Sequence, residues 1–319
     1  MIFMPEVLTI LILNVIFGVF ALIAFVLSVK IFLKWDLNST NKSQYKLEKQ
    51  SFLAATIIKY IFAIKVPLFL FFIFTLDKIS NVLTGAMCAA GVVDATAYGT
   101  YLFILKVINL YLFAYWLMLH SVDSKEEKQP YTKLKFAVFI GAFFFFVAEL
   151  ILEGFMFSAI DVDKMVSCCG TLYSSTSTSY ISNIFLIDTP LLLSLFYGNF
   201  LLIILFYIVK KRYLFAIANL LFIVVSLVSL IAFFGTYIYE LPTHHCPFCF
   251  LQKDYYYVGY AIYALLFGGT FYGIIVGFIQ SSKSEKNKNY FISILLNSIY
   301  VILLSLYPIL YFIKNGVWL

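Results

Sequence analysis

The sequence predicts an all-α protein, a bundle of about eight helices that crosses a membrane. Of 319 residues, 63% are hydrophobic and only 12% are charged, whereas a soluble domain carries about 25% charged residues. Several apolar runs also exceed the roughly 20 residues that a helix needs to cross the hydrocarbon core. We therefore predict one integral membrane domain over residues 1–319, surrounded by the lipid bilayer.

The apolar runs place the candidate spans. The first run contains no charged residue and no Lys or Arg precedes it, so it is predicted to be a span rather than a cleavable signal peptide of the usual form. Lys59, Lys65 and Pro67 interrupt the second run, which leaves a seven-span arrangement as the alternative. We expect spans at about residues 7–29, 51–76, 97–119, 136–158, 189–209, 213–239, 255–280 and 289–313.

The basic residues are distributed unequally between alternate loops. Of the 22 Lys and Arg residues, 15 lie in the loops after the first, third, fifth and seventh spans, and four lie in the remaining segments outside the spans. Cytoplasmic loops carry such an excess, so both termini are predicted to be on the outer side. Because the charges are spread over short loops, they form no nucleic-acid-binding face, and we expect no nucleic-acid partner.

All five cysteines lie in loops that this orientation places outside: Cys88, Cys168, Cys169, Cys246 and Cys249. The outer side of a bacterial inner membrane is an oxidising compartment, in which thiols form and keep disulfides. We therefore predict an inner-membrane protein of a bacterium, with its cysteine loops facing the periplasm.

The segment 240–252 is a short polar gap between two long apolar runs, and it contains Cys246-Pro-Phe-Cys249. Two cysteines at this spacing serve redox exchange or bind metals. A helix that starts close behind them would lower the pKa of a thiol and supply the reactive thiolate. Three interpretations stay open from the spacing, namely a redox-active pair, metal ligands and a structural disulfide.

Cys246-Pro-Phe-Cys249-Phe-Leu-Gln252 resembles the Cys-Pro-x-Cys-x-x-Gln segment of the quinone-linked disulfide-forming membrane oxidases, the DsbB family. The resemblance implies that Cys246 and Cys249 pass electrons from an outer thiol protein to a bound quinone. It covers seven residues. The family has four membrane helices, a second cysteine pair and commonly Arg after the Gln, whereas this chain has about eight spans and Lys253. Cys88, with Cys168 or Cys169, is the candidate second pair.

The outer loops also hold soft metal ligands. Thiolate and thioether sulfur suit Cu(I), and thiolate with imidazole suits zinc. Met87 and Met165 are weaker candidates, since both fit an ordinary membrane-interface position. The alternative is that His244 and His245 lie in a solvent-exposed surface loop and bind no metal. The candidate copper or zinc ligands are His244, His245, Cys246 and Cys249.

Three ionisable residues lie inside the predicted third and fourth spans. Glu149 and Glu153 are four residues apart and share one helix face, and Lys106 lies at a similar depth. A charge at this depth costs about 2.5–3.5 kcal/mol on insertion scales, so we expect Lys106 to pair with one of the glutamates. These residues, with Gln252, are predicted to line a proton path or a quinone pocket. The alternative is an ion pair that fixes helix packing.

The leading hypothesis is thiol–disulfide exchange linked to a membrane quinone. Cys246 and Cys249 would exchange electrons with a thiol protein, and Cys88, Cys168 and Cys169 would form a shuttle or resolving set. The alternatives are copper or zinc binding or transport, and a non-catalytic scaffold or receptor with structural disulfides. The sequence leaves undecided whether the chain is an enzyme.

Overall fold

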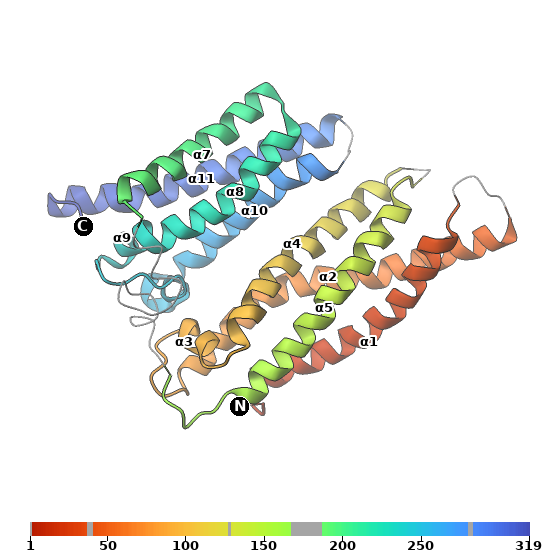
Figure 1. Ribbon diagram of the computed structural model, residues 1–319, viewed down its shortest axis with the longest axis horizontal. Helices are drawn as coiled ribbons and strands as arrows, with labels where there is room; N and C mark the ends of the chain where they lie inside the picture. Colours follow the sequence, from red (N-terminus) through yellow and green to blue (C-terminus); the bar gives the residue numbers. More distant parts are fainter. Residues whose placement is uncertain (1, 37–40, 127–128, 167–186, 280–282) are drawn as a thin grey trace. The chain divides into compact units, whose positions relative to one another are not determined.

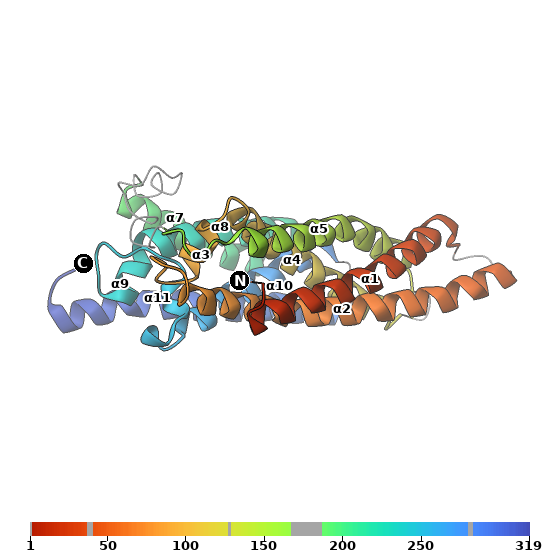
Figure 2. The ribbon, with the colours of Figure 1, turned by 90° about the horizontal axis from the view of Figure 1, so that it is seen from below.

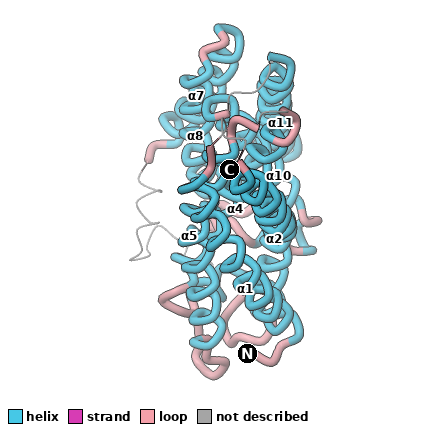
Figure 3. The backbone as a smooth tube through the Cα atoms, turned by 90° about the vertical axis from the view of Figure 1, so that its right-hand side faces the viewer, coloured by secondary structure: helices cyan, strands magenta, loops and turns pink. Residues whose placement is uncertain are grey.

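The computed structural model describes residues 2–36, 41–126, 129–166, 187–279 and 283–319. Within these ranges every regular element is helical, and none is a strand (Figure 3). Eight of the described helices are long and apolar enough to cross a membrane. Each of them overlaps one predicted span, which confirms the prediction of an all-α, multi-pass membrane protein.

The chain divides into two compact units. Unit 1 comprises Met1–Thr84 and Val92–Val166, and unit 2 comprises Gly85–Gly91 and Ser167–Leu319. Unit 2 therefore includes a short piece of chain from the connection between two helices of unit 1. The single membrane domain expected from the sequence stays a prediction, and each unit is described by itself.

Unit 1 is a four-helix bundle. Its long helices are α1 (Pro5–Lys34), α2 (Lys42–Ser80), α4 (Gly99–Asp123) and α5 (Thr132–Ala159). Each helix packs against the next one, and α5 returns to α1, so the four helices close a ring (Figures 1 and 2). The short helix α3 (Ala89–Asp94) lies in the connection from α2 to α4.

Helix α2 runs without a break through the residues that interrupt its apolar pattern. It begins at Lys42 instead of residue 51 and passes Pro67. Lys, Gln and Glu are good helix formers, so the polar segment before the apolar run extends the helix beyond the predicted span. Proline is tolerated in a membrane helix because neighbouring groups satisfy the backbone that it frees. The eight-span prediction therefore holds, and the seven-span alternative is wrong.

Unit 2 is a second four-helix ring, formed by α7 (Thr189–Val209), α8 (Arg212–Ser229), α10 (Val258–Phe278) and α11 (Lys283–Asn315). Figure 1 shows these helices running side by side. Helix α8 continues through a π-helical turn, η2 (Leu230–Phe234), into α9 (Gly235–Tyr239). The span predicted at 213–239 is thus one continuous helical segment with a π-helical turn near its C-terminal end.

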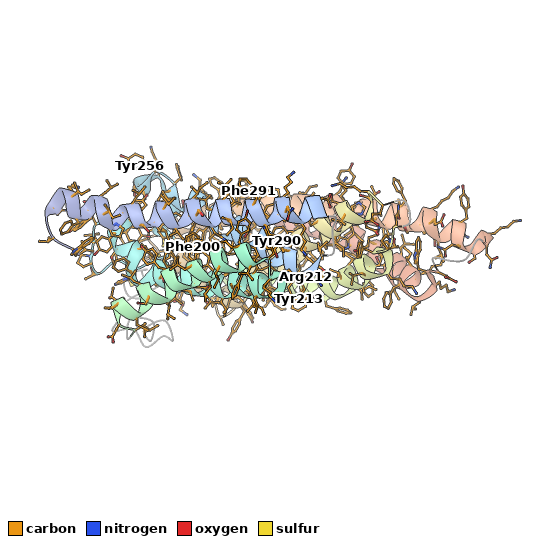
Figure 4. The ribbon with its side chains drawn as sticks, turned by 90° about the horizontal axis from the view of Figure 1, so that it is seen from above. Phe200, Arg212, Tyr213, Tyr256, Tyr290 and Phe291 are labelled. Carbon is orange, nitrogen blue, oxygen red and sulfur yellow. The ribbon has the colours of Figure 1, made fainter. Side chains whose placement is uncertain are left out.

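Helix α10 begins later than the sequence suggests, at Val258 instead of residue 255. Tyr256 and Tyr257 have φ angles of 53° and 56°, in the left-handed region that cannot continue an α-helix. Tyr256 projects from the ribbon and is 93% exposed (Figure 4). The chain between α9 and α10 is therefore a folded loop with its own short turns.

Candidate functional site

Three cysteine sulfurs of unit 2 lie together. The Sγ atoms of Cys88, Cys246 and Cys249 are all within 4.8 Å of one another. Cys88 Sγ and Cys246 Sγ are 3.5 Å apart, at hydrogen-bonding distance for two thiols. The three residues are 0%, 1% and 5% exposed, respectively. We call these three residues the thiol cluster.

The loop that carries Cys246 and Cys249 is built from tight turns. Glu240 adopts a left-handed conformation with φ of 53° and ends α9, and Cys249 starts a three-residue 3-10 turn, η3 (Cys249–Leu251). A second such turn, η4 (Lys253–Tyr255), follows. Cys246 thus precedes a short 3-10 turn and Cys249 begins it, whereas the sequence suggested that both cysteines lie at the N-terminus of the membrane helix. The backbone N–H of Phe248 supplies a local donor, 3.5 Å from Cys246 Sγ.

Two tyrosine hydroxyls hold this loop from the helices that flank it. Tyr239, the last residue of α9, donates to the carbonyl of Cys246 and accepts from the N–H of Phe250 at 3.1 Å. Tyr263 of α10 donates to the carbonyl of Pro247 at 2.7 Å. These hydroxyls pair with backbone N–H and C=O groups of a buried loop, and such groups cost free energy when they are buried without a partner. Sequence reasoning missed both, because in a chain with 24 tyrosines nothing marks these two.

The segment 85–91 brings Cys88 to the same loop. Gly85 has a φ of 92°, a conformation that glycine adopts without a steric penalty. The amide Nε2 of Gln252 donates to the carbonyl of Met87 at 3.2 Å. Gln252 therefore links the two segments that supply the cysteines. Its predicted contact with a quinone stays a prediction.

The predicted histidine ligands lie outside the thiol cluster. Within the described ranges, the group of close metal-ligating atoms consists of the three cysteine sulfurs alone. His245 uses its Nδ1 to donate to the carbonyl of Ile231 at 3.0 Å, in the π-helical turn. The ring of His244 packs edge-on against that of Tyr239, with centroids 4.3 Å apart. Burial lowers the pKa of His245 below its usual value.

The remaining predicted ligands are placed as follows. The side chains of Met87 and Met165 are exposed, at 67% and 76%. Cys168 and Cys169, predicted as resolving or shuttle thiols, lie outside the described residues. The thiol cluster therefore contains three of the five predicted catalytic cysteines.

The predicted intramembrane residues are in unit 1. Lys106 Nζ lies 2.8 Å from Glu149 Oε1 and 3.0 Å from Glu153 Oε1, so both pairs considered from the sequence form. Lys65 Nζ lies 2.9 Å from Glu149 Oε1, a contact that the sequence did not predict. The position of Lys65 inside the second apolar run was the available signal for this contact.

These features define a multi-pass helical membrane protein with a buried cluster of three cysteines. Comparisons with protein-family models, with curated proteins and with solved structures found no match for this chain. Any function therefore has to be argued from the residues themselves.

Proposed function

We propose that the chain is a thiol–disulfide redox protein of the membrane, with Cys88, Cys246 and Cys249 as its redox centre. The observation that carries the proposal is the 3.5 Å contact between Cys88 Sγ and Cys246 Sγ. A disulfide bond is about 2.05 Å long, so the two sulfurs need to approach by about 1.5 Å to bond. The backbone N–H of Phe248 donates to Cys246 Sγ at 3.5 Å.

The chemistry follows from the arrangement of the sulfurs. Oxidation joins Cys88 and Cys246 and releases two electrons and two protons, which a membrane quinone takes up to become a quinol. The Cys249 thiolate then attacks Cys246 Sγ, forms the Cys246–Cys249 disulfide and releases the Cys88 thiolate. A reduced thiol protein next attacks the new disulfide and leaves oxidised, which returns both thiols of the pair.

Burial of the cluster decides the order of these events. Because the three cysteines are 0–5% exposed, a protein thiol reaches them only after the loop 240–254 opens. Exchange among the three buried thiols needs no such opening. We therefore propose that internal exchange precedes contact with the partner.

The proposal includes the location. The excess of Lys and Arg in alternate loops favours an outer position for the cysteine loops, and the oxidising side of a bacterial inner membrane suits disulfide chemistry. The local resemblance to the DsbB family supports the same assignment and the choice of a quinone as the electron acceptor.

The test is to oxidise the purified full-length protein with a soluble quinone and to map its disulfides by alkylation and mass spectrometry. Replacing Cys168 and Cys169 by serine restricts the chemistry to the thiol cluster. With Cys249 present we expect the disulfide to end on Cys246 and Cys249. In Cys249→Ser, which cannot pass the disulfide on, we expect a peptide linked through Cys88 and Cys246, and this peptide should be lost when Cys88→Ser is added. Thiols that resist the quinone, or an unchanged rate of oxidation in Cys88→Ser, would contradict the proposal.

A second candidate function is binding of a soft metal ion, favoured by the mutual distances and burial of the three sulfurs. With Zn–S bonds of about 2.3 Å, sulfurs in a tetrahedral site are about 3.8 Å apart, so small shifts would suffice. Cu(I) suits a site of sulfur ligands equally well.

Elemental analysis of protein purified without reductant separates the two functions. The metal function predicts near-stoichiometric copper or zinc, with thiols protected from alkylation. Cys246→Ser would lose this metal and His245→Gln would keep it. Metal-free protein whose thiols form a reducible disulfide would reject the metal function.

A further inference from the structure

A second group of buried polar residues lies inside unit 1, which contains none of the thiols that the structure describes. It draws on all four long helices of the unit and none of its members is more than 6% exposed. We call it the charged network. Its members are Asn14 of α1, Lys65 of α2, Lys106 and Asn109 of α4, and Glu149 and Glu153 of α5.

The contacts of the charged network close into a ring. Lys65 and Lys106 both donate to Glu149 Oε1, at 2.9 Å and 2.8 Å. Lys106 also pairs with Glu153 Oε1 at 3.0 Å. Asn14 completes the ring, because its Nδ2 donates to Glu153 Oε2 at 2.6 Å and its Oδ1 accepts from Lys65 at 3.0 Å.

The charge balance of this ring limits what it can bind. Two ammonium groups face two carboxylates, so the ionised network is neutral. A metal cation would have to displace a lysine from a carboxylate, and an anion would have to displace a carboxylate from a lysine. Either exchange leaves an uncompensated charge in a medium where unpaired ions are costly. A proton, in contrast, can add to a carboxylate without displacing another group.

The size of the adjoining cavity also favours a proton as the species that binds. Its lining includes Lys65, Lys106, Glu149 and Glu153, and its volume is about 10 Å³. That is about the smallest space that holds one water molecule, and a quinone ring does not fit in it. In addition, Asn109 Oδ1 is buried without a hydrogen-bond partner in the described part of the chain. A water molecule can satisfy such an acceptor and can carry a proton.

We propose that the charged network is a proton-binding site and that Glu153 is the group that takes up the proton. The two carboxylates differ in their support. Glu149 accepts from two ammonium groups and, through Oε2, from Asn109 at 2.6 Å. Glu153 has one ammonium and one neutral amide. Protonating Glu153 leaves Lys106 paired with Glu149, whereas protonating Glu149 would deprive both lysines of their shared acceptor.

The charged network lies nearer to one end of the bundle than to the other. Glu153 lies six residues before the last residue of α5, Ala159, a helical rise of about 9 Å. Toward the other end, a layer of aromatic rings from Phe62, Phe113 and Trp116 fills the bundle. A separate buried ion pair lies beyond this layer, between Lys135 and Asp123 at 2.5 Å. The site therefore lies nearer the end of the bundle at which α5 finishes.

The experiment is infrared difference spectroscopy of the full-length protein in lipid between about pH 2 and pH 10, a range that spans the ordinary titration of carboxyl groups. Subtracting the difference spectrum of Glu153→Gln from that of the wild type isolates one carboxyl group. We expect a C=O band on acidification that is lost in Glu153→Gln. Asp123→Asn, which removes a buried carboxylate outside the charged network, should keep the band.

Two outcomes would overturn the proposal. One is a wild type in which Glu153 stays ionised throughout the range, as a fixed ion pair with a packing role would. The other is a band that persists in Glu153→Gln. If Glu153→Gln fails to fold, Glu153→Asp serves instead, and an unshifted band in this variant counts against the proposal. Because the readout involves no thiol, its failure is distinguishable from failure of the redox function.

Discussion

Each of the two units is a ring of four helices, but the polar groups that they bury differ. Unit 1 buries the charged network. Unit 2 buries a neutral network, in which Asn297 Nδ2 donates to Asn219 Oδ1 at 2.8 Å and Ser293 donates to the carbonyl of Gly269 at 2.7 Å. Both networks connect helices that are distant in sequence. Only the charged network contains groups whose charge a proton can change.

The difference follows from the size of the side chains at the helix contacts. Long lysine and glutamate side chains span the interior of unit 1. In unit 2, Gly269 and Gly273 let α10 approach its neighbours so closely that a Cβ at these positions would lie 2.3 Å from Asn297 Oδ1 and 2.2 Å from Asn219 Cγ, respectively. Short amides reach each other across such a contact. The close approach at Gly269 and Gly273 thus suits the short side chains of the neutral network.

Lys106→Met should give the largest effect. It leaves Glu153 without an ammonium partner and Glu149 with Lys65 alone. Breaking a buried pair on one side costs about 3–5 kcal/mol. We expect a loss of that size in the free energy of unfolding, measured by denaturation in mixed micelles. Adding Glu153→Gln should recover part of the loss, and a loss below about 1 kcal/mol for Lys106→Met would mean that the network carries little charge.

Gly273→Ala tests whether close approach matters in unit 2. The new Cβ would overlap Asn219, and overpacking a core typically costs about 1–3 kcal/mol. Gly198→Ala is the matched control, because a Cβ at that position of α7 meets nothing within 4 Å. The control should keep or slightly raise the free energy of unfolding. Equal effects of the two substitutions would refute the role of the glycine contact.

Asn297→Ala measures the neutral network directly. It removes the donor to Asn219 Oδ1, which keeps a contact from Ser293 Oγ at 3.3 Å. Hydrogen bonds between membrane helices contribute about 0.6 kcal/mol on average and up to about 1.7 kcal/mol. We expect a loss in this range, clearly smaller than that of Lys106→Met in the same denaturation assay. A larger loss than that of Lys106→Met would reverse the ranking of the two units.

The smallest of the predicted effects is that of acid on the stability of unit 2, and it acts through His245. Because burial lowers the pKa of His245, the unfolded chain takes up a proton at a higher pH than the folded chain does. Stability should therefore fall as the pH drops below about 6.5, the ordinary pKa of histidine. Melting temperatures of wild type and His245→Asn, compared across this range, check the prediction. The variant should lose this part of the pH dependence, and identical profiles would show that another group causes it.

The sequence predicts elements better than contacts. Length and hydropathy place all eight spans, because each run has to satisfy its own backbone in lipid. The pairing of Lys106 with a glutamate of α5 also follows from depth and from the shared helix face of Glu149 and Glu153, although that Lys106 contacts both does not. The partnership of Lys65 with Glu149 does not, because it depends on how α2 and α5 are rotated in the bundle. Asn14 is a single amide in an apolar run, so the sequence indicates only weakly that it belongs to the charged network.

The same limit applies to the thiol cluster. The one-sided distribution of cysteines and the Cys246-Pro-Phe-Cys249 spacing identify the residues. They do not place Cys88 beside Cys246, since that contact joins residues 158 positions apart. Nor do they exclude His244 and His245 from the cluster, because the π-helical turn that offers a carbonyl to His245 has no signature in the sequence.

The separation of Cys88 from Cys246 has a consequence for biosynthesis. At about 5–20 residues per second, a ribosome needs on the order of 10–30 s to add the 158 residues between them. During that time Cys88 has already been synthesised, but it cannot contact the thiols of the loop 240–254 because these residues have not yet been added to the chain. Assembly of the cluster therefore competes with every oxidant or stray thiol that the nascent chain encounters, and slower translation should increase the share of mispaired protein.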